Sequence, residues 1–138
     1  MHKRSSLLSG RPSGQAMAEF AVVASTFFLL LFGIIEMAIV VFRYNTVSAA
    51  AREAARYAVV HNPTSLNPAS TADIKAIAVS YAPFLSTDEV TVTFPADPTL
   101  PTQKDAVVSI SHNYTQTVPF MSAVPLTLTS SSQMLVSQ

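Results

Sequence analysis

The 138-residue chain contains no cysteine and no tryptophan, and it has three glycines, none of them after Gly33. Without cysteine it cannot form a disulfide framework or a thiolate metal site. Without later glycines it cannot carry the phosphate-binding loops of P-loop or dinucleotide-binding proteins. Its histidines lie far apart, His112 is expected to be a hydrogen-bonded core residue, and no GxSxG motif marks a nucleophilic serine. We therefore expect no cofactor, no metal, no small-molecule substrate and no catalysis.

The longest uniform feature of the chain is an apolar run. From Phe20 to Phe42 the polar residues are Ser25, Thr26 and Glu36. A bilayer core of about 30 Å needs about 20 apolar residues in a helix. A helix also satisfies its own backbone hydrogen bonds, which lipid cannot do. The run therefore predicts one membrane-spanning helix over residues 20–42.

Charge is scarce and unevenly distributed, since only 12% of the residues are charged and eight bases balance eight acids. Lys3, Arg4 and Arg11 precede the apolar run, whereas the part after residue 61 holds two lysines and five acids. Basic residues near a membrane helix tend to stay in the cytoplasm, so we expect a cytoplasmic N-terminus and an outer C-terminal part. Three arginines after the run weaken this orientation argument without reversing it. The acidic outer part argues against nucleic-acid binding.

The apolar run continues into an alanine-rich segment without a helix breaker. No Gly or Pro occurs between Ile34 and Asn62, and alanine is the best helix former. We predict a basic leader over residues 1–14 and a continuous helix over residues 15–61, about 70 Å long. Its outer half must pack on something, and the predicted helix-packing residues are Ala51, Arg52, Ala54, Ala55 and Arg56. The alternative for the two arginines is that they form surface pairs with Glu53.

Residues 62–138 predict a small outer domain. Ser70 is a candidate N-cap with Asp73 three residues later, and it precedes a short helix with apolar spacing from Ile74 to Tyr81. Three segments with alternating apolar residues follow, near residues 90–94, 108–114 and 126–136. The fold class is therefore α+β: a long N-terminal membrane-spanning helix that extends into a domain with a short helix and a three-stranded antiparallel sheet.

The segment GQAMAEF, from Gly14 to Phe20, resembles the processing site of type IV pilin-like precursors. The resemblance implies that a prepilin peptidase cuts between Gly14 and Gln15, which makes Glu19 the fifth residue of the mature chain. Gly10 is a poorer candidate because Arg-Pro follows it. Glu19 and Phe20 are then assembly residues, and Glu19 neutralises the new amine of Gln15 or that of a neighbouring subunit. The alternative is that Glu19 only reaches the lipid headgroups.

Glu36 is the second acid in the apolar run, and we also assign it to assembly. Acids inside membranes usually face protein or water, so a helix–helix contact is one interpretation. The other is an interfacial acid that reaches the headgroups or Arg43, which lies seven residues later. The sequence leaves both open.

The segments GQAMAEFAVV, FFLLLFGIIEMA and AAREAARYAV are similar to the TadE-like family of tight-adherence (Flp-type) pilus biogenesis. The likeness covers residues 11–60, and Ala54 stands where the family often has Gly. It implies a minor pseudopilin with a pilin-like fold, anchored in the bacterial inner membrane with a periplasmic domain. The implied partners are the prepilin peptidase, other pilin subunits and the pilus assembly platform. The alternatives are a major pilin, an uncleaved membrane-anchored envelope or adhesion protein and, least favoured, a secreted enzyme.

Overall fold

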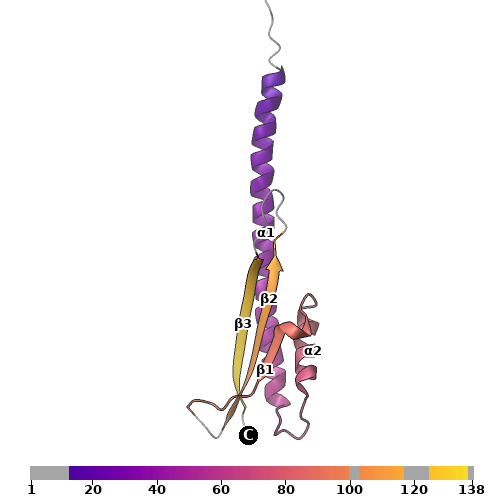
Figure 1. Ribbon diagram of the computed structural model, residues 1–138, viewed down its shortest axis with the longest axis vertical. Helices are drawn as coiled ribbons and strands as arrows, with labels where there is room; N and C mark the ends of the chain where they lie inside the picture. The colour runs from indigo at the N-terminus through magenta and orange to yellow at the C-terminus, as the bar shows by residue number, and fades with distance from the viewer. Residues whose placement is uncertain (1–12, 100–102, 117–124, 137–138) are drawn as a thin grey trace, which may run out of the picture. The chain divides into compact units, whose positions relative to one another are not determined.

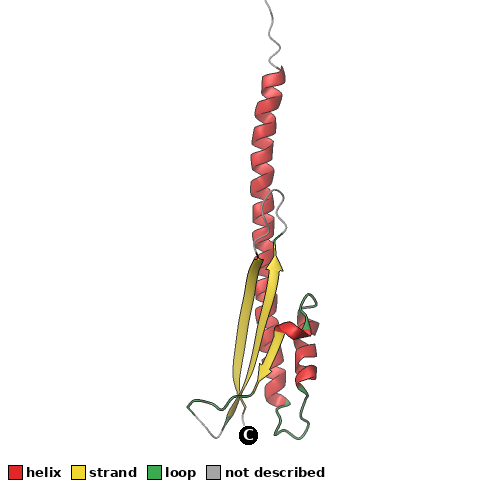
Figure 2. Ribbon diagram, viewed as in Figure 1, coloured by secondary structure: helices red, strands yellow, loops and turns green. Residues whose placement is uncertain are grey.

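The structure is a computed structural model that describes residues 13–99, 103–116 and 125–136. Its elements are α1 (Ser13–Val60), α2 (Thr71–Tyr81), the short 3-10 helix η1 (Thr87–Glu89), β1 (Val90–Thr93), β2 (Lys104–Thr115) and β3 (Pro125–Val136) (Figure 1). The strands form an antiparallel sheet in the order β1-β2-β3 (Figure 2). This confirms the predicted α+β fold class. Most of the predicted leader lies outside the described residues.

Helix α1 is continuous over 48 residues, about 72 Å. It is long and apolar enough to cross a membrane, which indicates a single-span membrane protein. The two hydroxyl side chains of the apolar run are satisfied within the helix, because Ser25 donates to the carbonyl of Ala21 at 2.7 Å and Thr26 to that of Val22 at 3.0 Å. The chain divides into two compact units, Met1–Ile35 and Glu36–Gln138, so α1 contributes to both.

Within the second unit, one side of α1 faces the rest of the domain. Glu36, Val40 and Arg43 are half-buried and Val47 is buried, at helical spacing. The same side continues as an alanine stripe with no exposed surface: Ala50, Ala51, Ala54, Ala55 and Ala58. A methyl side chain allows other elements to approach the helix backbone closely. The core is completed by apolar residues from α2 and the sheet.

Helix α2 begins with the predicted cap. The Ser70 hydroxyl accepts a hydrogen bond from the Asp73 amide at 3.2 Å, and the Asp73 carboxylate accepts one from the Ser70 amide at 2.9 Å. Ile74 and Ala78 are fully buried, as their spacing predicts. Tyr81 is 52% exposed, against expectation. The core near the end of α2 is filled instead by Ala82 and Leu85, which follow the helix.

The sheet extends along the C-terminal half of α1 (Figure 1). Strands β2 and β3 pair without interruption from Lys104 opposite Val136 to Thr115 opposite Pro125. Twelve residues of strand span about 40 Å, which matches about 38 Å of helix over residues 36–60. The buried face of β2 carries Ala106, Val108, Ile110, His112 and Tyr114. The last four of these were predicted from alternation to share one face.

Candidate functional site

The predicted processing residues lie in the first turns of α1. The Gln15 side-chain amide donates a hydrogen bond to the Glu19 carboxylate at 2.9 Å, so these two residues meet one helical turn apart. Phe20 is 73% exposed. A Cβ atom built on Gly14 would meet nothing within 4 Å, so packing among the described residues does not require glycine there.

Glu36 has a partner from the sheet that the sequence did not indicate. The Tyr114 hydroxyl donates a hydrogen bond to the Glu36 carboxylate at 2.7 Å, joining β2 to α1. Tyr114 is only 7% exposed. Burial raises the pKa of Tyr114, and so do its hydrogen bond to Glu36 and the negative charge there, while the positive charge of Arg43 acts in the opposite direction.

Arg43 lies against two aromatic rings from different parts of the domain. Its guanidinium carbon is 4.6 Å from the centre of the Tyr114 ring and 5.0 Å from that of Phe84. Contacts of this kind contribute about 0.5–2 kcal/mol each, the larger value where the cation is desolvated. The Arg43 Nη1 also lies 3.3 Å from Nε2 of His112. Arg43 therefore contacts β2 through the ring of Tyr114 and a hydrogen bond to His112, and it also contacts the ring of Phe84.

His112 connects Arg43 to an acid on η1. Because a guanidinium only donates, Nε2 of His112 must accept, and the ring proton then lies on Nδ1. That nitrogen is 2.9 Å from the Glu89 carboxylate, to which it donates. Burial opposes ionisation of Glu89, but hydrogen bonds from the Ser86 amide and from His112 lower the pKa of Glu89 overall. His112 is thus a hydrogen-bonded core residue, as expected.

These five residues form a group that we call the polar clamp: Glu36, Arg43, Glu89, His112 and Tyr114. It joins α1, η1 and β2 through alternating acidic, basic and neutral groups. In the part of the chain that the structure describes, no group of three or more potential metal ligands occurs. The arrangement of the clamp is suited to holding the sheet on the helix. Two sequence signals pointed to parts of it: the spacing of Glu36 and Arg43 on one helix face, and the alternation that placed His112 and Tyr114 on one strand face.

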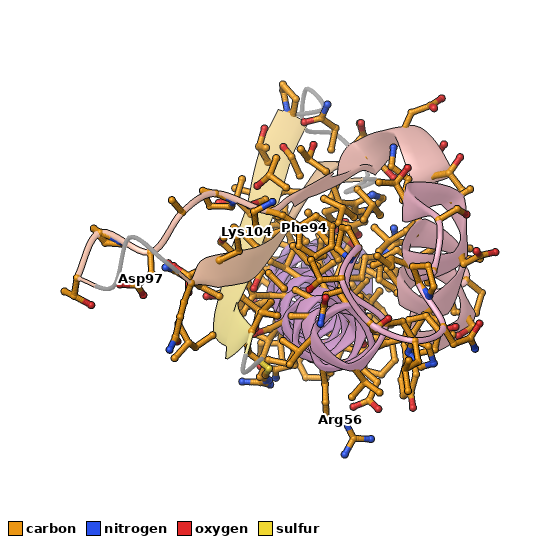
Figure 3. The ribbon with its side chains drawn as sticks, turned by 90° about the horizontal axis from the view of Figure 1, so that it is seen from below. Arg56, Phe94, Asp97 and Lys104 are labelled. Carbon is orange, nitrogen blue, oxygen red and sulfur yellow. The ribbon has the colours of Figure 1, made fainter. Side chains whose placement is uncertain are left out.

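The predicted helix-packing residues fall into two classes. Ala51, Ala54 and Ala55 have no exposed surface. Arg52 is exposed, and Arg56 pairs with Glu53 at 2.6 Å while 71% of its side chain is exposed. Figure 3 shows Arg56 pointing away from the domain. The Arg56–Glu53 contact is thus a surface pair, which contributes little to stability because water screens it.

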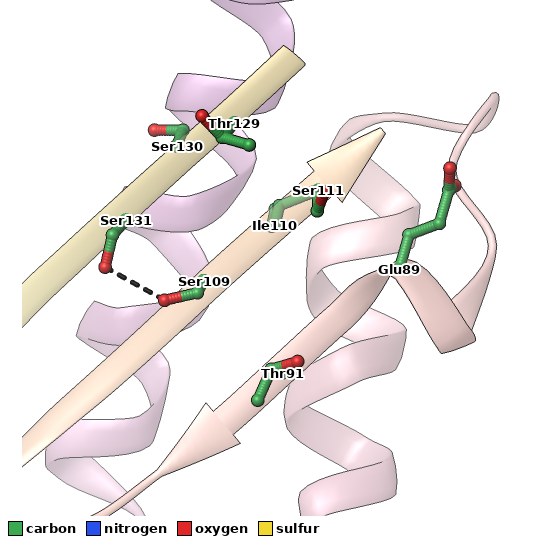
Figure 4. Close-up of a pocket in the computed structure, with 8 residues that line it drawn as sticks. All are labelled: Glu89, Thr91, Ser109, Ile110, Ser111, Thr129, Ser130 and Ser131. Atoms are coloured by element: carbon green, nitrogen blue, oxygen red, sulfur yellow. Dashed lines mark hydrogen bonds between the residues drawn. The ribbon is translucent and has the colours of Figure 1, made fainter. Parts of the chain in front are cut away.

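A shallow depression of about 280 Å³ lies on the outer face of the sheet (Figure 4). Its lining is mostly hydroxyl side chains from three strands, among them Ser109 and Ser131, whose oxygens are 3.0 Å apart. Glu89 is the one titratable residue that lines it. This is the same carboxylate that accepts the hydrogen bond from His112 at 2.9 Å.

The family model described as TadE-like protein matches residues 14–56. No curated protein and no solved structure matches the chain. The matched segment contains the predicted processing residues, Glu36, Arg43 and most of the alanine stripe, and it ends before α2 and the sheet. The TadE-like family is structural and acts in tight-adherence (Flp-type) pilus processes, and the match covers less than half of this chain. Residues 14–56 are therefore a TadE-like sequence, as their resemblance to that family indicated.

Proposed function

We propose that this chain is a minor pseudopilin, a structural subunit of tight-adherence (Flp-type) pilus biogenesis. It is held in the bacterial inner membrane by α1, with its N-terminus in the cytoplasm and the sheet domain in the periplasm. The observation that carries the proposal is that one TadE-like segment combines the Gly14 motif with a helix whose large apolar side chains are exposed. Such a helix serves both as membrane anchor and as the contact with other pilin subunits and the assembly platform.

Maturation by a prepilin peptidase is the second part of the proposal. Cleavage after Gly14 leaves a positive amine on Gln15, one turn from Glu19, and the Gln15–Glu19 contact at 2.9 Å supports this proximity. A carboxylate near a helix N-terminus is favourable, because the helix dipole is positive there. An uncompensated charge within lipid costs up to about 2.5–3.5 kcal/mol at the helix centre. Glu19 therefore has a reason to pair with its own amine or with that of a neighbouring subunit.

Two matched glycine variants test the maturation. A Cβ atom meets nothing within 4 Å at either Gly14 or Gly33, so Gly14→Ala and Gly33→Ala are both accommodated by the fold. The mass of the protein purified from membranes should correspond to a chain that begins at Gln15. Gly33→Ala should give the same mass, and Gly14→Ala should retain the leader. A wild-type chain that still carries residues 1–14 contradicts the proposal.

The assembly role of Glu19 is tested separately from cleavage. Glu19→Ala should be cleaved and inserted in the membrane, but it should reduce piliation, because the amine loses its counter-charge. Glu53→Ala removes an acid from the same helix, in a surface pair with Arg56, and should leave piliation unchanged. Normal piliation in the Glu19→Ala strain would exclude this role.

A further inference from the structure

His112 connects α1 to η1 through both of its ring nitrogens. Nε2 accepts a hydrogen bond from Nη1 of Arg43 at 3.3 Å, and Nδ1 donates one to the Glu89 carboxylate at 2.9 Å. This arrangement requires a neutral ring, because only neutral imidazole has one donor and one acceptor nitrogen. The charge of a histidine ordinarily changes between about pH 5 and 8. The contact between α1 and β2 through His112 therefore depends on a group that takes up a proton in mild acid.

The charged and titratable groups around the ring come from three elements. Arg43 from α1 and Glu89 from η1 bond to it directly. Tyr114 lies two residues further along the same face of β2 and donates to Glu36 of α1. Glu89 stays ionised in mild acid, because its pKa lies below the ordinary value of 4.5. The His112 ring therefore has an anion on its Nδ1 side and a cation on its Nε2 side.

Protonation changes the two sides of the ring in opposite ways. The imidazolium carries N–H groups on both nitrogens and has no acceptor. Nδ1 still donates to Glu89, and this hydrogen bond becomes stronger because both partners are charged. Nε2 instead directs an N–H group at the N–H group of Arg43, so that two positively charged donors lie 3.3 Å apart. The contact between Arg43 and His112 cannot persist in this form.

We propose that His112 is a pH-sensitive switch, in which protonation of Nε2 releases Arg43 of α1 while the ring stays bound to Glu89. The ring is the less mobile partner, because its side chain is only 8% exposed. It also lies against the ring of Phe84, with the ring centres 5.1 Å apart. Arg43 is half-buried, and its long side chain can turn its charged end toward water. The arginine therefore moves and the histidine does not.

Release of Arg43 changes how α1 is held on the sheet. The guanidinium carbon lies 4.6 Å from the centre of the Tyr114 ring and 5.0 Å from that of Phe84, and both contacts end when Arg43 leaves. The hydrogen bond from Tyr114 to Glu36 does not involve His112 and remains. Mild acid should therefore loosen the sheet on the helix without detaching it.

Nitrogen NMR of the isotope-labelled full chain in detergent micelles follows both groups without a substitution. At about pH 8 the His112 ring should have a proton on Nδ1 and none on Nε2. On titration to about pH 5.5, Nε2 should take up a proton, and the Arg43 guanidinium signal should shift with the same midpoint. A His112 ring that stays neutral throughout overturns the proposal, and so does an Arg43 signal that does not follow the protonation of His112.

Two matched variants assign the shift to one histidine. His112→Gln retains an acceptor near the position of Nε2 but cannot take up a proton in this range, so its Arg43 signal should not change with pH. His61 stacks on Tyr57 outside the polar clamp, so His61→Gln should keep the shift of the unsubstituted chain. An Arg43 signal that still shifts in His112→Gln contradicts the switch.

Stability gives a second readout, which does not depend on a substitution of His112. Arg43→Gln should lower the urea midpoint of the sheet domain at about pH 8, because the contacts of Arg43 are lost. At about pH 5.5 the same substitution should lower the midpoint less, because the contacts have already opened in the unsubstituted chain. An equal loss at both pH values overturns the proposal.

Discussion

Replacing Tyr114 with Phe removes one hydroxyl group and tests whether the polar clamp holds the sheet on α1. The hydroxyl donates to an ionisable carboxylate at 2.7 Å, and hydrogen bonds to charged groups contribute about 1.5–3 kcal/mol. The ring remains, so the contact with Arg43 at 4.6 Å should persist. We therefore expect Tyr114→Phe to lower the free energy of unfolding of the sheet domain by about 1.5–3 kcal/mol.

The measurement is pulse proteolysis of the full chain in detergent micelles across a urea series. Tyr81→Phe is the matched control, because Tyr81 is 52% exposed and outside the clamp, and it should change stability by less than about 0.5 kcal/mol. A double-mutant cycle with Glu36→Gln isolates the coupling between the two side chains. If Tyr114→Phe changes stability no more than Tyr81→Phe does, the clamp is not an energetic link between sheet and helix.

Two further predictions concern the core and the effect of acid. Ala54→Leu should destabilise the domain by about 1–3 kcal/mol, because the larger side chain has no room at a fully buried position. The control is Ala49→Leu at an exposed position of the same helix, which should not destabilise the domain. The urea midpoints of the two variants are compared. Glu89 has a pKa below its ordinary value of 4.5 in the folded chain, so the unfolded chain binds more protons as the pH falls. The stability that Glu89 contributes is present above about pH 4.5 and lost as the pH falls through the lowered pKa. The urea midpoint should therefore vary less between pH 7 and pH 3 in Glu89→Gln than in the unsubstituted chain. An equal pH dependence of the midpoint in the two proteins would contradict this.

Local patterns in the sequence predicted both α-helices and the three strands, but not the 3-10 helix η1 (Thr87–Glu89). The absence of Gly and Pro between Ile34 and Asn62 predicted the unbroken helix, and the structure has it as far as Val60. Ser70 and Asp73 predicted the start of α2, and alternation predicted the buried faces of β2 and β3. These features depend on residues a few positions apart, whose geometry the backbone period determines.

The partners within the clamp were decided by the tertiary structure. Glu36 and Tyr114 are 78 positions apart, and Arg43 and His112 are 69 apart. Alternation placed Tyr114 on the inner face of β2 without indicating which turn of the helix it would meet. The turn that Tyr114 meets depends on the position of the sheet along the axis of α1. Packing of the sheet against the alanine stripe and α2 determines this position. The sequence alone determined that a long apolar helix leads into a small domain with a three-stranded sheet. The level at which they join depends on contacts between distant segments, and no local period encodes it.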